Sequence, residues 1–545
     1  MPAPALLTAN TLAGSHVPAP PLPRLGHAWR TLEHGFDSVF GARDNPLKQL
    51  GALGVWLLTL LLISGCLLYV VLDTSAAGAY PSIAALDAWP WRLGSALRGL
   101  HRYGADAFVL VMGLHLVREW LLGRFRYWRR AIWWTGVPLV GLAFVSAIGG
   151  FWLNWDRLGQ YSAEATAQWL DALPFLASPL ARNFLLDQSL NDRLFTLFVF
   201  IHIGVPLLLV FGLWFHLQRI SLAQVFPTRR LAWGMLLTLL LLALLAPVRS
   251  QGMAQLSSQS AALALDWWLL FIHPLVDSTS PATGWALVLL GFAALALAPL
   301  WPSPARQPVA QVYPEHCSGC QRCLADCPYS AISMVPHPSG KAGAQLAQVR
   351  ADLCASCGIC AGSCPSSTPF RSAAQLVTGI DMPQWPVDAL RAQLLQGLRD
   401  LPGPGRYLVL GCAQGAQPRQ LAPDTLLLPL VCAGALPPAF IEYALRHGVD
   451  GVLVSGCRPG GCEFRLGQRW SAERLAGTRA PQLRRSAARE RLHMAWLDCG
   501  DEAALATALE RLRQQCPAGC GAAQPTLESL ESPPSPPAPP QETPA

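Results

Sequence analysis

Apolar runs without a single charged residue dominate the first 305 residues of this 545-residue chain. They cover residues 49–72, 131–155, 194–218, 231–248 and 278–305. A helix needs about 20 apolar residues to cross the hydrocarbon core of a bilayer, and these runs approach or exceed that length. The first half of the chain is therefore predicted to be a bundle of membrane-spanning helices.

A sixth segment, about 99–122, is apolar but carries His101, Asp106 and His115. We count it as a span because of the histidine pattern described next. Six spans put both termini on the same side of the membrane. The loops on that side hold the arginines Arg118, Arg124, Arg126, Arg129, Arg130, Arg219, Arg229 and Arg230. The positive-inside rule therefore predicts a multi-pass protein of a bacterial-type inner membrane, with both termini in the cytoplasm.

Two pairs of histidines in the apolar half share one spacing. His101 and His115 are 14 residues apart, and so are His202 and His216. Fourteen residues make close to four helical turns, so each pair lies on one helix face, about 21 Å apart along the axis. Such helices can hold two porphyrins, each ligated by one histidine from each helix. A hydrogen bond to a neighbouring helix is the alternative for a single histidine, but it does not explain a repeated interval.

Glycines on two other spans repeat the same interval. Gly51 and Gly65 lie on the first span, and Gly136 and Gly150 on the third. Glycine allows a flat macrocycle to approach a helix backbone closely. Small-residue helix packing also uses glycine, but it requires no matching interval. The pattern favours a four-helix core around two haems.

The same residues resemble cytochrome b of bc-type quinol complexes, over roughly residues 27–300. The likeness is carried by His101-Arg-Tyr-Gly104, by Gly149-Gly-Phe-Trp-Leu-Asn-Trp155 and by the His202/His216 segment. The resemblance implies that His101 and His202 bind a haem near the periplasmic face and that His115 and His216 bind one near the cytoplasm. It also implies a quinone or quinol site beside each haem, and it is compatible with a homodimer.

Two positions depart from that family. Asn154 stands where a proline is common, and Leu265-Asp266-Trp267-Trp268 replaces an element with a proton-accepting glutamate. Asp266 is a suitable base for a quinol proton. An interfacial acid beside membrane-belt tryptophans is the alternative interpretation of Asp266. With no Rieske-type segment in the chain, a bifurcating quinol cycle is not expected from it alone.

The remaining half of the chain is rich in cysteine. Only Cys66, of 16 cysteines, precedes Trp301. Two runs of the form CxxCxxCxxxCP follow, and this duplication is the signature of a bacterial ferredoxin with two [4Fe–4S] clusters; disulfides and zinc fit the spacing less well. The fourth cysteine of each run ligates the other cluster. The predicted ligand sets are Cys317, Cys320, Cys323 and Cys364 for one cluster, and Cys354, Cys357, Cys360 and Cys327 for the other.

Residues 404–500 have the pattern of a small α/β unit. Short β-rich runs at 407–411 and 451–455 end at Cys412 and Cys457, and residues 437–448 have helical character. Sites in parallel sheets gather at the carboxyl ends of strands. We therefore expect four cysteines to meet at one edge and to hold a [2Fe–2S] cluster. These are Cys412, Cys432, Cys457 and Cys462. A zinc site and free buried thiols are the alternatives.

This region resembles the delta subunit of methyl-viologen-reducing hydrogenase. The matching stretches are Val431-Cys-Ala-Gly434, residues 448–457 and the turn Pro459-Gly-Gly-Cys462. The resemblance implies a [2Fe–2S] cluster and electron transfer with the flavin-containing A subunit of heterodisulfide reductase. Cys499, Cys516 and Cys520 receive no assignment.

Together these patterns predict a multi-domain protein: a six-span helical cytochrome b with a four-helix haem core, an α+β ferredoxin-like domain and a small α/β domain. A mean hydropathy of +0.32 agrees with a chain that is half in the membrane. The net charge of +7 comes from arginines that flank apolar runs, so membrane lipid is expected as a partner and nucleic acid is not. The expected boundaries are 1–26 (disordered, without a signal peptide), 27–302, 311–370, 371–403 (linker), 404–522 and 523–545 (Pro-rich tail).

The predicted function is that of a membrane subunit of a quinone-linked oxidoreductase. It would pass electrons between quinone, two b haems, two [4Fe–4S] clusters and one [2Fe–2S] cluster, to or from a soluble flavoprotein. The alternative is a redox-sensing or membrane-anchor subunit that binds haem and clusters but turns over no quinone.

Overall fold

The computed structural model forms two compact units, Leu22–Ala305 and Arg306–Ala545. The residues that it describes are 24–174, 192–218, 220, 222–255, 263–300, 308–341, 343–371, 375–402, 405–418, 420–484 and 488–521. The tail predicted over 523–545 lies outside these residues, and so does nearly all of the predicted disordered segment 1–26. Helix α1 begins at Arg24, inside that segment.

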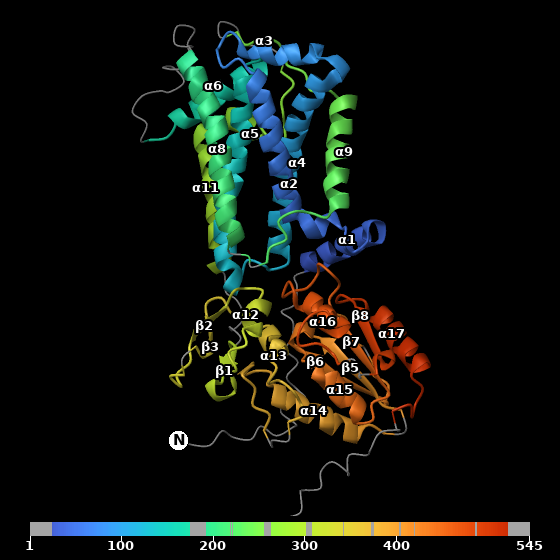
Figure 1. Ribbon diagram of the computed structural model, residues 1–545. Coiled ribbons are helices and arrows are strands. Elements are labelled where there is room, and N and C mark those ends of the chain that lie inside the picture. The colour runs from blue at the N-terminus through green and yellow to red at the C-terminus, as the bar shows by residue number, and fades with distance from the viewer. Residues whose placement is uncertain are drawn as a thin grey trace, which may run out of the picture. The chain divides into compact units, whose positions relative to one another are not determined.

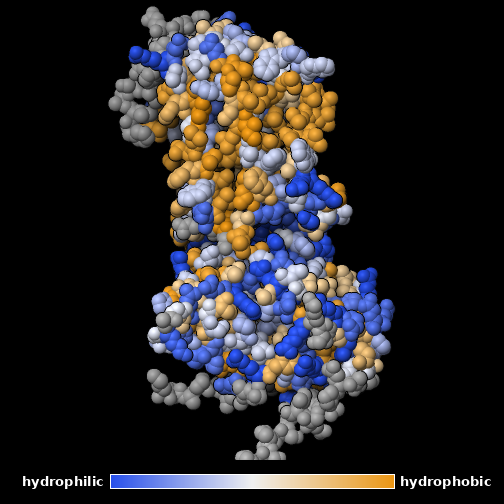
Figure 2. Space-filling view, viewed as in Figure 1, coloured by the Kyte–Doolittle hydropathy of each residue, from blue (hydrophilic) through white to orange (hydrophobic). Residues whose placement is uncertain are grey.

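The first unit is helical (Figure 1). Its helices are α1 (Arg24–Phe40), α2 (Leu50–Val71), α3 (Ala79–Ala84), α4 (Leu93–Leu121), α5 (Arg130–Asn154), α6 (Arg157–Asp171), α8 (Asp192–Gln218), α9 (Arg229–Leu245), α10 (Ile272–Ser278) and α11 (Pro281–Leu297). Helix α2 packs along α4, and α5 packs along α8. Figure 2 shows that apolar side chains cover the middle of the long helices and that hydrophilic side chains lie toward their ends.

Among the described residues, four helices are long and apolar enough to cross a membrane: Pro46–Val71, Arg130–Asn154, Phe195–Gln218 and Pro281–Leu300. The histidine-bearing α4 has 29 residues and includes charged side chains, and α9 has 17 residues. These two helices occupy the other segments that we predicted to span. The prediction of several membrane-spanning helices is confirmed, and the count of six stays a prediction.

The second unit begins with two short antiparallel ribbons and two short helices. Strand β2 (Ile332–Pro336) pairs with β3 (Gln345–Val349), and β1 (Gln311–Val312) pairs with β4 (Ile380–Asp381). Helices α12 (Arg322–Asp326) and α13 (Ile359–Ser363) each contain the third cysteine of one run, Cys323 and Cys360. Because β4 closes onto β1, this ferredoxin-like fold extends past residue 370, where we expected it to end.

A parallel sheet forms the rest of this unit. Its strand order is β6-β5-β7-β8, with bounds Thr425–Leu430, Tyr407–Cys412, Gly451–Gly456 and Leu492–Trp496. The helices beside it are α14 (Val387–Asp400), α15 (Ala439–Arg446), α16 (Gly467–Ala476) and α17 (Glu502–Gln515). Strands β5 and β7 and helix α15 lie where the sequence predicted them, whereas β8, α16 and α17 were not anticipated.

The segment 371–403 is more than the linker that we expected. Helix α14 places Leu390, Leu394 and Leu398 at intervals of one helical turn, and all three are buried against the sheet residues Leu408 and Leu428. The apolar periodicity therefore belongs to a core helix of the α/β domain.

Replacing Leu394 by Ala is expected to destabilise the α/β domain by about 2–5 kcal/mol, because its side chain is 1% exposed and leaves a cavity. Hydrogen exchange of the β5 and β7 amides in the full-length protein measures this effect. Leu395, which is only partly buried, provides the matched control. Equal exchange in the Leu394→Ala and Leu395→Ala proteins would show that α14 is a linker after all.

Candidate functional site

The four predicted haem ligands lie on two helices, His101 and His115 on α4 and His202 and His216 on α8. The imidazole centroids of His101 and His202 are 6.3 Å apart, with ring planes at 74°. A metal–imidazole bond is about 2 Å long, so this separation leaves room for one metal atom between the two rings. His115 and His216 are close enough to interact electrostatically.

Each of the four predicted glycines faces one histidine. A Cβ atom added to Gly65 would lie 3.1 Å from Cε1 of His101, and one on Gly150 would lie 2.9 Å from Cε1 of His202. The corresponding distances are 3.5 Å from Gly51 to His115 and 3.2 Å from Gly136 to His216. These contacts are tighter than, or as tight as, ordinary van der Waals contact. The 14-residue glycine interval therefore mirrors the histidine interval because each glycine makes space for an imidazole.

Hydrogen bonds to Nδ1 determine how three of these histidines present Nε2. Ser64 Oγ donates its proton to the Leu60 carbonyl at 2.7 Å, so it accepts from Nδ1 of His101 at 3.0 Å. A neutral imidazole that carries its proton on Nδ1 has a free lone pair on Nε2. That lone pair is the one that a haem iron requires, so the chemistry of the site fits a haem.

The Nδ1 atoms of two further histidines are held in the same way. Thr135 Oγ1 donates to the Ile132 carbonyl at 2.8 Å and accepts from Nδ1 of His216 at 2.9 Å. Nδ1 of His202 donates to the carbonyl of Ser146 at 3.0 Å. Ser64 and Thr135 were not anticipated from the sequence. A signal was present, because each hydroxyl residue directly precedes one of the spaced glycines.

Asp266 lies beside α4. Its Oδ2 is paired with the guanidinium of Arg102, while its Oδ1 accepts from the backbone N–H groups of Trp268 at 3.0 Å and Leu269 at 2.7 Å. The same guanidinium contacts Asp106 at 2.5 Å. The carboxylate predicted to accept a proton therefore shares one arginine with a second carboxylate.

Asn154, the departure from the family pattern, is the last residue of α5. Its side-chain oxygen accepts from Arg98 at 3.3 Å and from the Ser250 hydroxyl at 3.0 Å. A proline at this position has no such acceptor. The asparagine thus joins the buried Arg98 on α4 to the end of α5.

The eight ferredoxin cysteines gather as two sets in the folded chain. Cys323 has Cys364, Cys320 and Cys317 as its electrostatic neighbours, and Cys360 has Cys357, Cys354 and Cys327 among its own. Burial is the main reason why the pKa of Cys323 rises to about 12, and the neighbouring sulfurs add to it. In each set four cysteine sulfurs come together, which is the ligand set that a [4Fe–4S] cluster requires, so both sets fit the predicted clusters.

The four cysteines of the α/β domain lie at one edge of its sheet. Cys412 ends β5, Cys432 and Cys457 directly follow β6 and β7, and Cys462 lies in the next loop. Their sulfurs lie together as a ring, in which Cys432 and Cys457 each neighbour Cys412 and Cys462. These neighbouring sulfurs, together with burial, raise the pKa of Cys432 and Cys457. Four convergent buried sulfurs fit a [2Fe–2S] cluster.

The second ferredoxin set lies close to this ring of sulfurs. Ile359, between Cys357 and Cys360, contacts two glycines of the α/β domain: a Cβ on Gly434 would lie 3.0 Å from its Cγ1 and one on Gly467 would lie 3.5 Å from its Cδ1. The same added atom on Gly467 would lie 3.5 Å from the Cys462 sulfur and would collide with that of Cys432. Among the described residues, no three His, Cys, Asp or Glu side chains are arranged to hold a single metal ion. The assignment of the cysteines to iron–sulfur clusters therefore depends on their spacing in the sequence and on which cysteines lie near one another.

Comparisons with known proteins identify three segments of the chain. Residues 45–244 match the family cytochrome b/b6/petB, residues 316–368 match the 4Fe-4S dicluster domain, and residues 411–517 match the delta subunit of methyl-viologen-reducing hydrogenase. A solved chain described as "Hyperthermophilic respiratory Complex III" shares 17% identity with a TM-score of 0.36, covering 50% of this chain and 80% of that chain.

The fold and these matches define a membrane electron-transfer subunit. Its chain joins a cytochrome b segment, a dicluster ferredoxin and a hydrogenase delta-subunit domain, in that order, so the resemblances predicted from the sequence are confirmed. A cytochrome b segment implies haem b, and the dicluster domain implies [4Fe–4S] clusters.

Replacing Gly150 by Ala is expected to lower the haem content, because the new methyl group displaces the His202 imidazole. The b-type absorbance per protein should fall by up to one half if His101 and His202 hold one of two haems, as a reduced-minus-oxidised spectrum would show. Gly149→Ala is the matched control on the same helix, since its Cβ meets His202 at an ordinary 3.9 Å. Normal spectra from both variants would contradict the glycine assignment.

Replacing Cys462 by Ser is expected to remove one iron–sulfur signal and leave the haem and cubane signals unchanged, because its sulfur belongs to the ring at the sheet edge. Low-temperature electron paramagnetic resonance (EPR) of the reduced protein, with iron analysis, measures this loss. The exposed Cys499, changed to Ser, serves as the control. Unchanged iron in the Cys462→Ser protein would exclude the [2Fe–2S] assignment.

Proposed function

We propose that this chain exchanges electrons between membrane quinone and a soluble flavoprotein resembling the heterodisulfide reductase A subunit. Two b haems, two [4Fe–4S] clusters and one [2Fe–2S] cluster would supply one-electron redox chemistry when bound. The observation that supports this most strongly is the placement of the histidines. His101 and His202 face each other at 6.3 Å with Nδ1 atoms held by their neighbours, which leaves both Nε2 atoms for one iron.

The chain's own residues have distinct tasks in this proposal. His101 and His202 would hold the haem near the periplasmic face, and His115 and His216 the one near the cytoplasm. The glycines opposite them keep side-chain atoms away from the macrocycles. The arginine-rich loops favour an orientation with both iron–sulfur domains in the cytoplasm, where a soluble partner can reach them.

Asp266 is proposed to accept the proton that quinol releases. Its oxygen Oδ2 would take the proton, and Arg102 would then remain paired with Asp106, so that the arginine is not left without a counter-charge. A shared arginine thus lets one carboxylate change its charge while the other keeps the ion pair.

The test of the proposal is the response of the haems to quinol. Purified full-length protein should show reduction of haem b on addition of a quinol, followed in the visible spectrum, and a quinone-site inhibitor should prevent it. Protein that holds all its haem but does not respond to quinol would favour the alternative, a redox-sensing or anchor subunit. Co-purification with a flavin-containing protein tests the soluble partner separately.

Asp266→Asn should slow quinol-driven haem reduction by roughly 10²-fold or more, the usual contribution of a general base. Asp106→Asn is the comparison variant, because it keeps the proposed acceptor and removes only the second counter-charge of Arg102, so it should slow the reaction less than Asp266→Asn does. Both variants should keep wild-type haem content. Equal slowing in the two proteins would show that Asp266 only holds Arg102 in place.

A further inference from the structure

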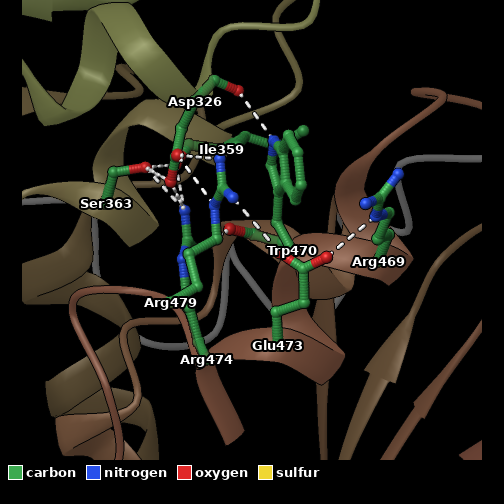
Figure 3. A network of polar contacts seen from close by, with 9 residues as sticks. Asp326, Ile359, Ser363, Arg469, Trp470, Glu473, Arg474 and Arg479 are labelled. Carbon is green, nitrogen blue, oxygen red and sulfur yellow. Dashed lines mark hydrogen bonds and ion pairs between the residues drawn. The ribbon is translucent and has the colours of Figure 1, made fainter. Parts of the chain in front are cut away.

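One buried arginine contacts segments that carry ligands of all three predicted iron–sulfur clusters. Arg474 of α16 is fully buried, and its guanidinium reaches three segments (Figure 3). Nη1 donates to the carbonyl of Gly434 at 2.8 Å, two residues after Cys432. Nη2 donates to Asp326 at 2.5 Å and to Ser363 at 2.6 Å, which directly precede Cys327 and Cys364.

The residues around Arg474 complete a closed network. Ser363 donates to Asp326 at 2.7 Å, and Arg479 contacts the other carboxylate oxygen at 2.8 Å. The Trp470 indole donates to the Asp326 carbonyl at 3.1 Å, and Arg479 lies over the Trp470 ring at 3.3 Å. Every strong acceptor that Arg474 uses lies within two residues of a predicted cluster ligand.

The space around the guanidinium is tightly filled. A Cβ on Gly362 would lie 2.8 Å from Arg474 Nη1 and would collide with the Gly434 carbonyl. A Cβ on Gly358 would lie 2.9 Å from that of Ala435. The loop that bears Cys357 and Cys360 is therefore in direct contact with the loop that follows Cys432.

We propose that Arg474 is a positioning residue that sets the spacing between the second cubane site and the four-cysteine site, and that its charge raises the reduction potential of the groups bound on either side. This inference rests on the cluster assignments of the proposed function. Its geometric basis is the planar guanidinium fork, which holds Gly434 and Asp326 at once, as an ammonium cannot. Its electrostatic basis is a permanent cation in a water-poor interior, which stabilises an added electron nearby.

Two substitutions separate these effects. In Arg474→Lys the charge remains but the fork is lost, so the spin–spin broadening between the two sites in EPR should weaken while midpoint potentials stay near wild type. In Arg474→Gln the charge is also lost and Asp326 remains, so the midpoint potentials of the cubane that includes Cys327 and of the [2Fe–2S] group should both fall. Arg469→Gln is the control, because Arg469 lies on the same helix, is mostly exposed and pairs with Glu473 instead.

The measurements use the full-length protein reduced chemically, so they require neither quinone nor flavoprotein. Iron and sulfide analysis first establishes that each variant is loaded. Wild-type broadening and potentials in both loaded Arg474 variants would overturn the inference and leave the proposed function standing. If Arg474→Gln fails to fold, unchanged broadening in loaded Arg474→Lys overturns the positioning role by itself. A wild-type protein without a [2Fe–2S] signal would overturn both the inference and the proposed cofactor set.

Discussion

The helical unit depends on one constraint, which is that an imidazole inside an apolar bundle needs a partner for its Nδ1–H group. Leaving such a polar group unsatisfied in an apolar interior costs roughly 2–7 kcal/mol. His101 and His216 find their partners in hydroxyl groups of α2 and α5, and His202 finds a carbonyl of α5. Each bond fixes the ring and frees Nε2. Helix packing and ligand orientation are consequently set by the same contacts.

The iron–sulfur unit meets a related constraint with a different type of partner. Most of its predicted cluster ligands are buried or partly buried, and burial alone opposes the thiolate form that a cluster requires. Backbone N–H groups offset part of this cost, as in the contacts from Ala331 to Cys327 at 3.3 Å and from Gly434 to Cys432 at 3.4 Å. In both cases the donor lies within four residues of the cysteine, so the short loop after the cysteine brings a backbone donor to its sulfur.

Local periodicity made much of this architecture predictable. The 14-residue intervals encode helix faces, and the cysteines after β5 and β7 follow from the geometry of parallel sheets, so the placement of His101 or Cys412 could be anticipated. Local periodicity does not predict contacts between segments that are far apart in the sequence. Arg474 meets Asp326 across 148 residues, and nothing in either local pattern indicates the pairing. Helix α14 was missed because its apolar stripe is short and lies between two stronger motifs.

The buried pair of Asp326 and Arg474 is a poor explanation of stability, because removing two charges from water offsets most of the attraction that they gain. Apolar side chains of similar volume would fill the same space at least as favourably. An ion pair with fixed geometry has a different advantage, since a slip of either loop leaves a charge unpaired in the interior, which costs about 3–5 kcal/mol. The pair therefore destabilises misaligned arrangements of the two loops far more than it stabilises the native arrangement. Under the proposed function electrons pass between two sulfur sites, and their rate depends on the distance between the loops that carry those sites. An ion pair between these loops keeps that distance fixed.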